Sequence, residues 1–207
     1  MNSEQREESL TLGLLRAIDE QNDLTQRHLA DRLGVALGLA NAYLRRCVRK
    51  GLVKVKQAPA NRYLYYLTPK GFSEKGRLSA EYLRRSFDFY RSASGSVTRV
   101  FAQCQREGYE RLVLCGVSEL AEISLIRARE YPLRIVAMFD PACRAARYVD
   151  LPAWTVLDRN QFDVCVLTAI TAPETHYAKV AARVPPARIL VPDILGLPAD
   201  VRRGAAA

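Results

Sequence analysis

Two short runs of helical periodicity, separated by three residues of which the first is a glycine, constrain the fold of this chain more than any other feature of its sequence. Residues 25–33 (TQRHLADRL) have their apolar side chains at helical spacing and follow Thr25, a residue type that caps helices. Gly34 is expected to end this helix, because glycine is common just after a helix. A second helical run over residues 37–50 follows after a few residues. Together with an amphipathic run at residues 4–21, they predict three helices with a tight turn between the last two.

The second of these helices separates into an inner and an outer face. One stripe is apolar and is expected to pack against the other helices: Ala40, Leu44, Cys47 and Val48. The outer residues suit DNA, because arginine bonds guanine or phosphate, asparagine bonds adenine, and glycine or alanine lets a helix approach the major groove closely. With two residues that begin the preceding helix, they form the predicted DNA-contacting set: Gln26, Arg27, Gly38, Asn41, Ala42, Arg45, Arg46 and Arg49. An ordinary solvated face is the alternative.

A hairpin is predicted directly after the second helix. Residues 52–56 (LVKVK) and 62–67 (RYLYYL) favour strands, and the QAPAN between them favours a turn. In this place a hairpin is the wing of a winged helix, and its basic and polar residues are predicted to reach phosphates or the adjacent minor groove: Lys54, Lys56, Asn61 and Arg62. Thr68 and Pro69 then begin another helix.

Positive charge is concentrated in the same part of the chain. The whole chain has 31 Lys and Arg against 22 Asp and Glu, a net charge of +9. Residues 23–70 have 10 against 2, or +8, whereas residues 111–207 have 12 against 10, or +2. A basic surface of this kind binds polyanions, and double-stranded DNA is the predicted partner.

These stretches also resemble a known family. LADRLGV at residues 29–35, RKGLVKV at 49–55 and YYLTPKG at 65–71 look like the winged helix-turn-helix of MarR-type regulators, and more narrowly like the group associated with bacterial exopolysaccharide loci. The likeness covers roughly residues 10–90. It implies a transcriptional regulator that binds two half-sites of DNA as a homodimer and that controls polysaccharide genes.

A linker with an aromatic stripe follows the hairpin. Residues 74–91 are expected to form a helix that carries apolar side chains at spacings of three and four: Leu78, Tyr82, Leu83, Phe87 and Tyr90. The stripe predicts a dimer contact, and packing on its own chain is the alternative. SASGS at residues 92–96 predicts a break, and residues 97–107 a further helix.

Strands alternate with helices from Tyr109 onward. Strands are predicted at residues 111–116, 133–140, 153–158, 163–169 and 188–192, with helices up to residue 130 and at 174–182. Short apolar strands separated by helices indicate a parallel sheet with both faces covered. The predicted organisation is an α+β winged helix-turn-helix domain at residues 1–77, linker and dimerisation helices at 78–108, and an α/β Rossmann-like domain with a parallel sheet at 109–207.

Ligands bind such sheets beyond the carboxyl ends of the strands. Gly116 is one glycine where a dinucleotide fingerprint has three, but Asp140 follows it by 24 positions, near the offset at which an acid meets a ribose hydroxyl. Ser118 could donate to a phosphate, whereas Glu119 would repel a pyrophosphate. The predicted ligand-binding residues are Gly116, Val117, Ser118, Glu119, Asp140, Thr168, Ala169 and Thr171. A purely structural domain that mediates oligomerisation is the alternative.

The C-terminal half resembles the small Rossmann-like domains that precede sugar-nucleotide acyltransferase and dehydratase modules, with the Gly loop, the acid after the second strand and LPAWTVLD at residues 151–158 in the same order. The domain order also resembles redox-sensing repressors, in which a winged helix precedes an NADH-binding unit. These likenesses imply a small-molecule effector that contains a nucleotide. A UDP-sugar is favoured over NAD(H), and no cofactor is certain.

Other functional classes have less support in the sequence. The C-terminal half has no Tyr-x-x-x-Lys pair, the chain has no G-x-S-x-G or H-E-x-x-H, and His176 stands alone, so an enzyme is not expected. The five cysteines have no C-x-x-C spacing and are expected to be reduced thiols, mostly in the core, with a redox role for Cys115 as the alternative. No apolar run is long enough to span a bilayer and the N-terminus is polar, so a cytoplasmic protein without membrane contact is expected.

Overall fold

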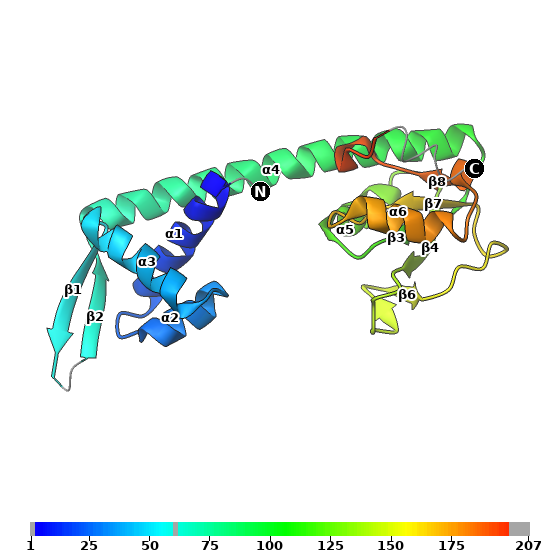
Figure 1. The fold of residues 1–207 in the computed structure, drawn as a ribbon. Coiled ribbons are helices and arrows are strands. Elements are labelled where there is room, and N and C mark those ends of the chain that lie inside the picture. Colours follow the sequence, from blue (N-terminus) through cyan, green and yellow to red (C-terminus); the bar gives the residue numbers. More distant parts are fainter. Residues whose placement is uncertain (1–2, 60–61, 199–207) are drawn as a thin grey trace. The chain divides into compact units, whose positions relative to one another are not determined.

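The chain folds into two compact units, Met1–Phe87 and Asp88–Ala207, in a computed structural model that describes residues 3–59 and 62–198. Figure 1 labels most elements of each unit. One long helix, α4 (Pro69–Arg106), belongs to both units, its first half to the first and its second half to the second. Residues 78–106, most of the segment predicted as separate linker helices at 78–108, therefore lie in a single helix.

The first unit has three helices, then a hairpin, then the start of α4. Its elements are α1 (Ser3–Glu20), α2 (Gln26–Leu33), α3 (Leu37–Arg49), β1 (Val53–Ala58) and β2 (Arg62–Leu67). The predicted caps are present: the Thr25 hydroxyl accepts from the N–H of His28 at 3.1 Å, and Gly34 ends α2 with a φ of +61°. These local signals are the reason why the predicted helix ends are close to the observed ones.

The core of this unit lies between the three helices and the hairpin. Leu14, Leu15 and Leu29 are almost completely buried in it, and Tyr65 of β2 and Leu78 of α4 pack into the same core. Leu78 was predicted as part of a dimer stripe, and this placement is wrong because its side chain fills the core of its own chain. The rest of that stripe, Tyr82, Leu83, Phe87 and Tyr90, is exposed.

The start of α4 is held against the end of α3. The Thr68 hydroxyl accepts from the N–H of Gly71 at 3.0 Å, as predicted for a capping residue, and donates to the carbonyl of Gly51 at 2.6 Å. Gly71 lies so close to the backbone of Leu52 that a Cβ atom on it would be 2.0 Å from the Leu52 carbonyl oxygen. Only glycine permits this approach of helix to backbone.

The α4 helix continues through residues 92–96, so the predicted break is wrong. The small side chains there serve packing: Ala93 and Ser96 are buried. The Ser96 hydroxyl donates to the carboxylate of Asp193 and accepts from the N–H of Ile194 at 3.1 Å, at the short 3₁₀ helix η2 (Asp193–Leu195). These tertiary contacts outweigh the weak helix propensity of serine and glycine.

The second unit is built on a six-stranded sheet in the order β5-β6-β4-β3-β7-β8. Its strands are β3 (Arg111–Cys115), β4 (Arg134–Phe139), β5 (Arg147–Tyr148), β6 (Leu151–Trp154), β7 (Val164–Leu167) and β8 (Ile189–Leu190). All neighbours are parallel except β5 and β6, which form an antiparallel hairpin at one edge. The predicted parallel sheet is confirmed, whereas β5 was not predicted.

Helices cover both faces of this sheet. On one face Leu112 and Leu114 pack with α5 (Glu119–Ala128) and with the second half of α4. On the other face Val113 and Cys115 pack with α6 (Pro173–Ala181). The alternation along β3 sends neighbouring side chains to opposite cores.

One predicted strand has a different position. The sequence predicts a strand at residues 153–158, and the structure has β6 at Leu151–Trp154. The chain leaves the sheet after Trp154, and Asp158 closes a turn by accepting from the N–H of Asn160 at 3.0 Å. Aspartate favours such a turn because its carboxylate bonds a backbone N–H two residues on.

In the described part of the chain all five cysteines are free thiols, and four of them are buried, as predicted. None of the helices described here is long and apolar enough to cross a lipid bilayer.

Candidate nucleic-acid interface

The outer face of α3 is a narrow stripe of four residues. Gly38, Ala42, Arg45 and Arg49 are spaced four, three and four residues apart, opposite the buried side of the helix, and all four are exposed. The first half of the stripe has no bulky side chain, since a Cβ atom on Gly38 would meet nothing within 4 Å. The second half carries two guanidinium groups. A helix with this face can approach a groove closely at one end and bond bases or phosphates at the other.

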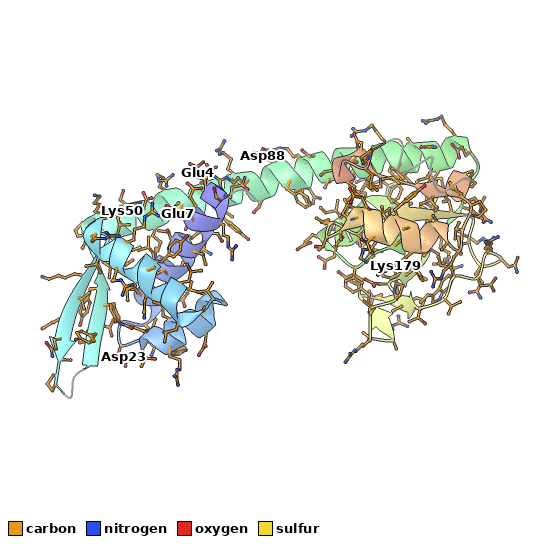
Figure 2. The ribbon with its side chains drawn as sticks, viewed as in Figure 1. Glu4, Glu7, Asp23, Lys50, Asp88 and Lys179 are labelled. Atoms are coloured by element: carbon orange, nitrogen blue, oxygen red, sulfur yellow. The ribbon has the colours of Figure 1, made fainter. Side chains whose placement is uncertain are left out.

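Two other predicted contacts on α3 are placed differently. Arg46 lies on the side of the helix that faces α1, where its guanidinium pairs with the Glu7 carboxylate at 2.5 Å; Glu7 is labelled in Figure 2. Asn41 is half-buried, and its Oδ1 is buried without a hydrogen-bond partner among the described residues. The structure therefore separates the guanidinium of Arg46 from those of Arg45 and Arg49, which the sequence alone places on one face.

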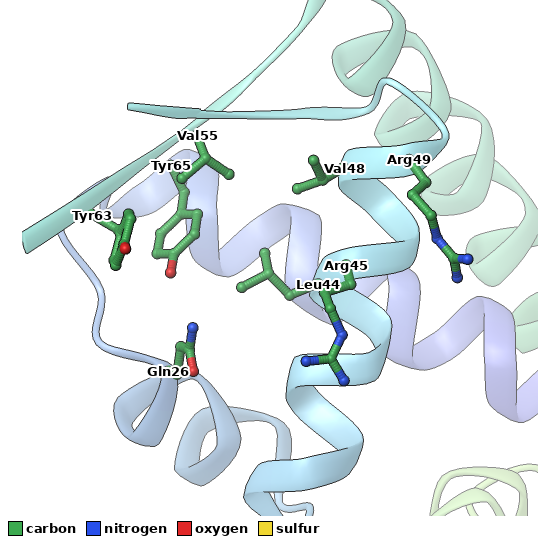
Figure 3. Close-up of a pocket in the computed structure, with 8 residues that line it drawn as sticks. All are labelled: Gln26, Leu44, Arg45, Val48, Arg49, Val55, Tyr63 and Tyr65. Atoms are coloured by element: carbon green, nitrogen blue, oxygen red, sulfur yellow. The ribbon is translucent and has the colours of Figure 1, made fainter. Parts of the chain in front are cut away.

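A groove separates α3 from the wing. Its volume is about 490 Å³, and Figure 3 shows the side chains that line it: Gln26, Leu44, Arg45, Val48, Arg49, Val55, Tyr63 and Tyr65. Three of these come from the hairpin, in which Val55 pairs with Tyr65. In Figure 3 the hydroxyl of Tyr65 and the amide of Gln26 point toward one another across this space. The tyrosines of the groove were not predicted as site residues, although the alternation in RYLYYL puts Tyr63 and Tyr65 on one face of the strand.

The basic residues of the wing lie on its other face. Lys54 and Lys56 are exposed and alternate with Val55, so they point away from the groove. Gln26 and Arg27 are exposed in the first turn of α2. Of the remaining predicted contacts, Asn61 lies outside the described residues, and for Arg62 only the backbone in β2 is described.

The core residue behind the stripe is electrically neutral. Burial raises the pKa of the Cys47 thiol to about 11, although Lys50 and Arg46 oppose the shift. The thiol therefore stays protonated at neutral pH and packs as a small apolar group.

A second place with predicted site residues is the carboxyl edge of the sheet. The loop after β3, the end of β4 and the end of β7 meet there through hydrogen bonds among Gly116, Val117, Ser118, Asp140 and Thr168, and Gly116 approaches Ala169 closely. Glu119 and Thr171 are exposed. The prediction that residues from three strand ends converge is thus met, but their hydrogen bonds run to one another.

A cavity of about 360 Å³ at the end of β6 was not predicted. Its lining is Ala153, Trp154, Thr155, Val156, Asp158 and Gln161. The single tryptophan of the chain, Trp154, was the signal in the sequence that could have indicated this cavity. Trp154 is half-buried and its ring is tilted against that of Phe162, with centroids 6.5 Å apart.

Comparison with protein families gives a match to the part of the chain that contains α3. A family model described as winged helix-turn-helix DNA-binding matches residues 8–54, from α1 to the first residues of β1. Residues 8–54 of the N-terminal unit thus match a winged helix-turn-helix DNA-binding domain, and the unit has that fold. The winged helix-turn-helix fold that was predicted within residues 1–77 is thereby confirmed over residues 8–54, and the rest of the chain lies outside the match.

Solved structures similar to the chain include two transcription regulators and a DNA-binding protein. MepR, a transcription regulator of the Staphylococcus aureus multidrug efflux pump MepA, is 24% identical over 40% of this chain and 61% of its own, with a TM-score of 0.35. The PcaV transcriptional regulator from Streptomyces coelicolor is 24% identical over 47% of this chain and 74% of its own, with a TM-score of 0.39. Sso10a-2, a DNA-binding protein from Sulfolobus solfataricus, is 19% identical over 48% of this chain and 96% of its own, with a TM-score of 0.37. The chain thus spans less than two thirds of MepR, and no curated protein matches it.

Proposed function

We propose that this protein is a transcriptional regulator of the MarR type that binds double-stranded DNA. The observation that carries the proposal is the exposed stripe of Gly38, Ala42, Arg45 and Arg49 on α3 of the winged helix domain. In this arrangement α3 enters the major groove, and the wing reaches the flanking phosphates or minor groove with Lys54 and Lys56. The excess of 10 basic over 2 acidic residues in the segment 23–70 supports a polyanionic partner.

Salt dependence of binding tests this proposal. Fluorescence anisotropy with a labelled duplex from the region upstream of its own gene is expected to show an affinity that falls about a thousandfold between 50 and 200 mM salt, if about six phosphates are contacted. A scrambled duplex of equal length is the control, and it should bind more weakly at each salt concentration. Absence of binding, or binding that salt does not weaken, would show that the protein is not a DNA-binding regulator. Promoters of polysaccharide genes are the next duplexes to test, because of the resemblance to regulators of exopolysaccharide loci.

We further propose that the regulator is a homodimer that pairs through α4. Tyr82, Leu83 and Phe87 are 55, 52 and 59% exposed within two turns of this helix. Large apolar side chains gathered in this way are typical of a protein interface. A two-fold dimer also brings two recognition helices to two half-sites, which a single winged helix cannot do.

Charged substitutions in this patch are expected to separate the dimer. In Leu83→Glu and Phe87→Glu the new carboxylates would be buried at the interface without partners, so sedimentation equilibrium should show a dissociation constant raised at least about 100-fold. Phe72→Glu is the matched control, because Phe72 is a 51% exposed phenylalanine of the same helix outside the patch. If both patch variants remain dimers as tight as the control, the dimer contact lies elsewhere.

The second unit is proposed as a Rossmann-like effector domain. Its five parallel strands follow the order third, second, first, fourth, fifth along the chain, counted without the β5 hairpin strand, and helices lie on both faces. UDP-sugars and NAD(H) are the ligand classes to screen by thermal shift, the latter for a redox-sensing repressor. The competing proposal is a unit that only helps the regulator to oligomerise, which no ligand in the screen would stabilise.

A further inference from the structure

A nucleotide phosphate needs free backbone N–H groups at the start of a helix. In the second unit the helix that would supply them is α5, and the loop before it runs from Gly116 to Ser118. The question is whether these N–H groups are available to a ligand. Three of these N–H groups, those of Val117, Leu120 and Ala121, have acceptors within the unit.

Asp140 occupies the first of these positions. Its carboxylate is buried, with the residue 8% exposed, and Oδ2 accepts from the N–H of Val117 at 3.3 Å while Oδ1 accepts from the N–H of Ala142 at 2.9 Å. The backbone N–H of Asp140 donates to the carbonyl of Trp154 at 3.2 Å, which holds the residue in place. An acid expected to reach a ribose hydroxyl instead bonds the loop that would hold the phosphate.

The Ser118 hydroxyl occupies two further positions at the start of α5. Its hydroxyl accepts from the N–H groups of Leu120 at 3.1 Å and Ala121 at 3.3 Å, and donates to the carbonyl of Thr168. The helix start is thus capped by the side chain of its own loop. The same hydroxyl ties the loop to the end of β7.

Gly116 also helps to hold the β3–α5 loop against the end of β7. Its φ is +107°, and a Cβ atom on it would lie 2.5 Å from the Cβ and 2.6 Å from the backbone nitrogen of Ala169. The hydroxyl of Thr168 donates to the carbonyl of Gly116 at 2.6 Å. The glycine is therefore required for the contact between two strand ends, which explains it without a pyrophosphate.

The charges around the start of α5 are also unfavourable for a phosphate. Glu119 and Glu122 lie in the first turn and are exposed. Glu122 accepts from the hydroxyl of Tyr148 at 2.8 Å. Burial, and to a smaller extent this carboxylate, raises the pKa of Tyr148 to about 12, so the tyrosine remains a neutral donor. Two exposed carboxylates would repel an added anion.

We infer that Asp140 is an internal ligand of the β3–α5 loop, where its carboxylate takes the place that the phosphate of a nucleotide would take. The second unit accordingly binds no pyrophosphate at this loop. An effector of the proposed sensor therefore makes no pyrophosphate contact with the β3–α5 loop. This inference narrows the effector part of the proposed function and is independent of DNA binding by the winged helix domain.

Chemical rescue of an Asp140→Ala variant of the full chain tests the internal ligand. The variant should melt about 5 °C or more below the wild type, since two backbone N–H groups lose their acceptor. Inorganic phosphate should then raise its melting temperature by several degrees beyond sodium chloride of equal ionic strength, and should leave the wild type unchanged. Asp158→Ala is the matched control: its carboxylate also accepts from a backbone N–H, but in an exposed turn, and phosphate should not rescue it.

The wild type supplies a second arm that needs no variant. In an amide NMR spectrum, pyrophosphate, UDP-glucose and NAD⁺ at millimolar concentrations should leave the signals of Val117, Leu120 and Ala121 unmoved. Movement of these signals with a saturable affinity would overturn the inference, as would an Asp140→Ala variant that melts with the wild type and ignores phosphate. Anisotropy with duplex DNA, measured on the same samples, distinguishes these outcomes from a failure of the regulator proposal.

Discussion

Gly71→Ala is expected to destabilise the winged helix domain by about 3 kcal/mol, the upper range for an added group in a packed place. A Cβ atom at this position would be 2.0 Å from the carbonyl oxygen of Leu52 and 3.0 Å from its carbonyl carbon, so α4 would have to move away from the end of α3. The Thr68 cap beside it, which joins Gly51 to Gly71, would be strained by the same movement. Hydrogen exchange of the amides of α1 to α3 measures this loss in the full chain.

Gly76→Ala is the matched control for this prediction, with an effect of opposite sign. Gly76 is exposed on the same helix, and a Cβ atom on it would meet nothing within 4 Å. Alanine there should stabilise the domain by about 0.5–1 kcal/mol, because it restricts the unfolded chain and favours the helix. If the two variants change the exchange of these amides equally, the close approach at Gly71 does not hold α4 in place.

Arg45→Ala and Arg49→Ala are each expected to weaken binding to the specific duplex by about 10- to 100-fold, or about 1–3 kcal/mol. Their guanidinium groups belong to the exposed stripe and line the groove beside the wing. Anisotropy titrations at several salt concentrations separate two kinds of contact. Loss of a phosphate contact lowers the slope of log affinity against log salt by about one, whereas loss of a base contact lowers the preference for the specific duplex.

Arg46→Ala is the control for these arginine variants. It removes the same charge from the next position of the same helix, but the Arg46 guanidinium pairs with Glu7 of α1. We expect its affinity for DNA to fall less than threefold, since an exposed ion pair contributes only about 0–1 kcal/mol to stability. Equal losses in Arg45→Ala and Arg46→Ala would mean that the contact face is as wide as the sequence alone predicts.

Much of the winged helix domain could be predicted because its signals are local. Thr25, Gly34 and Thr68 cap or end helices through atoms a few residues away, so the sequence contains both partners of each interaction. The position of Arg46 could not be predicted in this way. Helical spacing places it on the outer side of α3, but its direction depends on Glu7, which a different helix brings within reach.

The errors in the second half have the same origin. SASGS at residues 92–96 has the composition of a loop, and it is helical because Ser96 bonds a turn almost 100 residues later in the chain. The offset between Gly116 and Asp140 predicted that they lie near one another, and the bond between Val117 and Asp140 brings them together. The sequence does not show that the Asp140 carboxylate bonds the amide of Val117, because the two residues are 23 positions apart.

The continuous α4 helix also decides how the winged helix domain can be isolated. A fragment that ends at residue 77 would stop one residue before Leu78, which is 3% exposed in the core, and would lack Arg85, whose guanidinium bonds Glu8 of α1 at 2.7 Å. A fragment that ends at Phe87 keeps both contacts. Limited proteolysis should therefore leave an N-terminal piece that includes the first half of α4, with the three apolar side chains of the proposed dimer contact still attached.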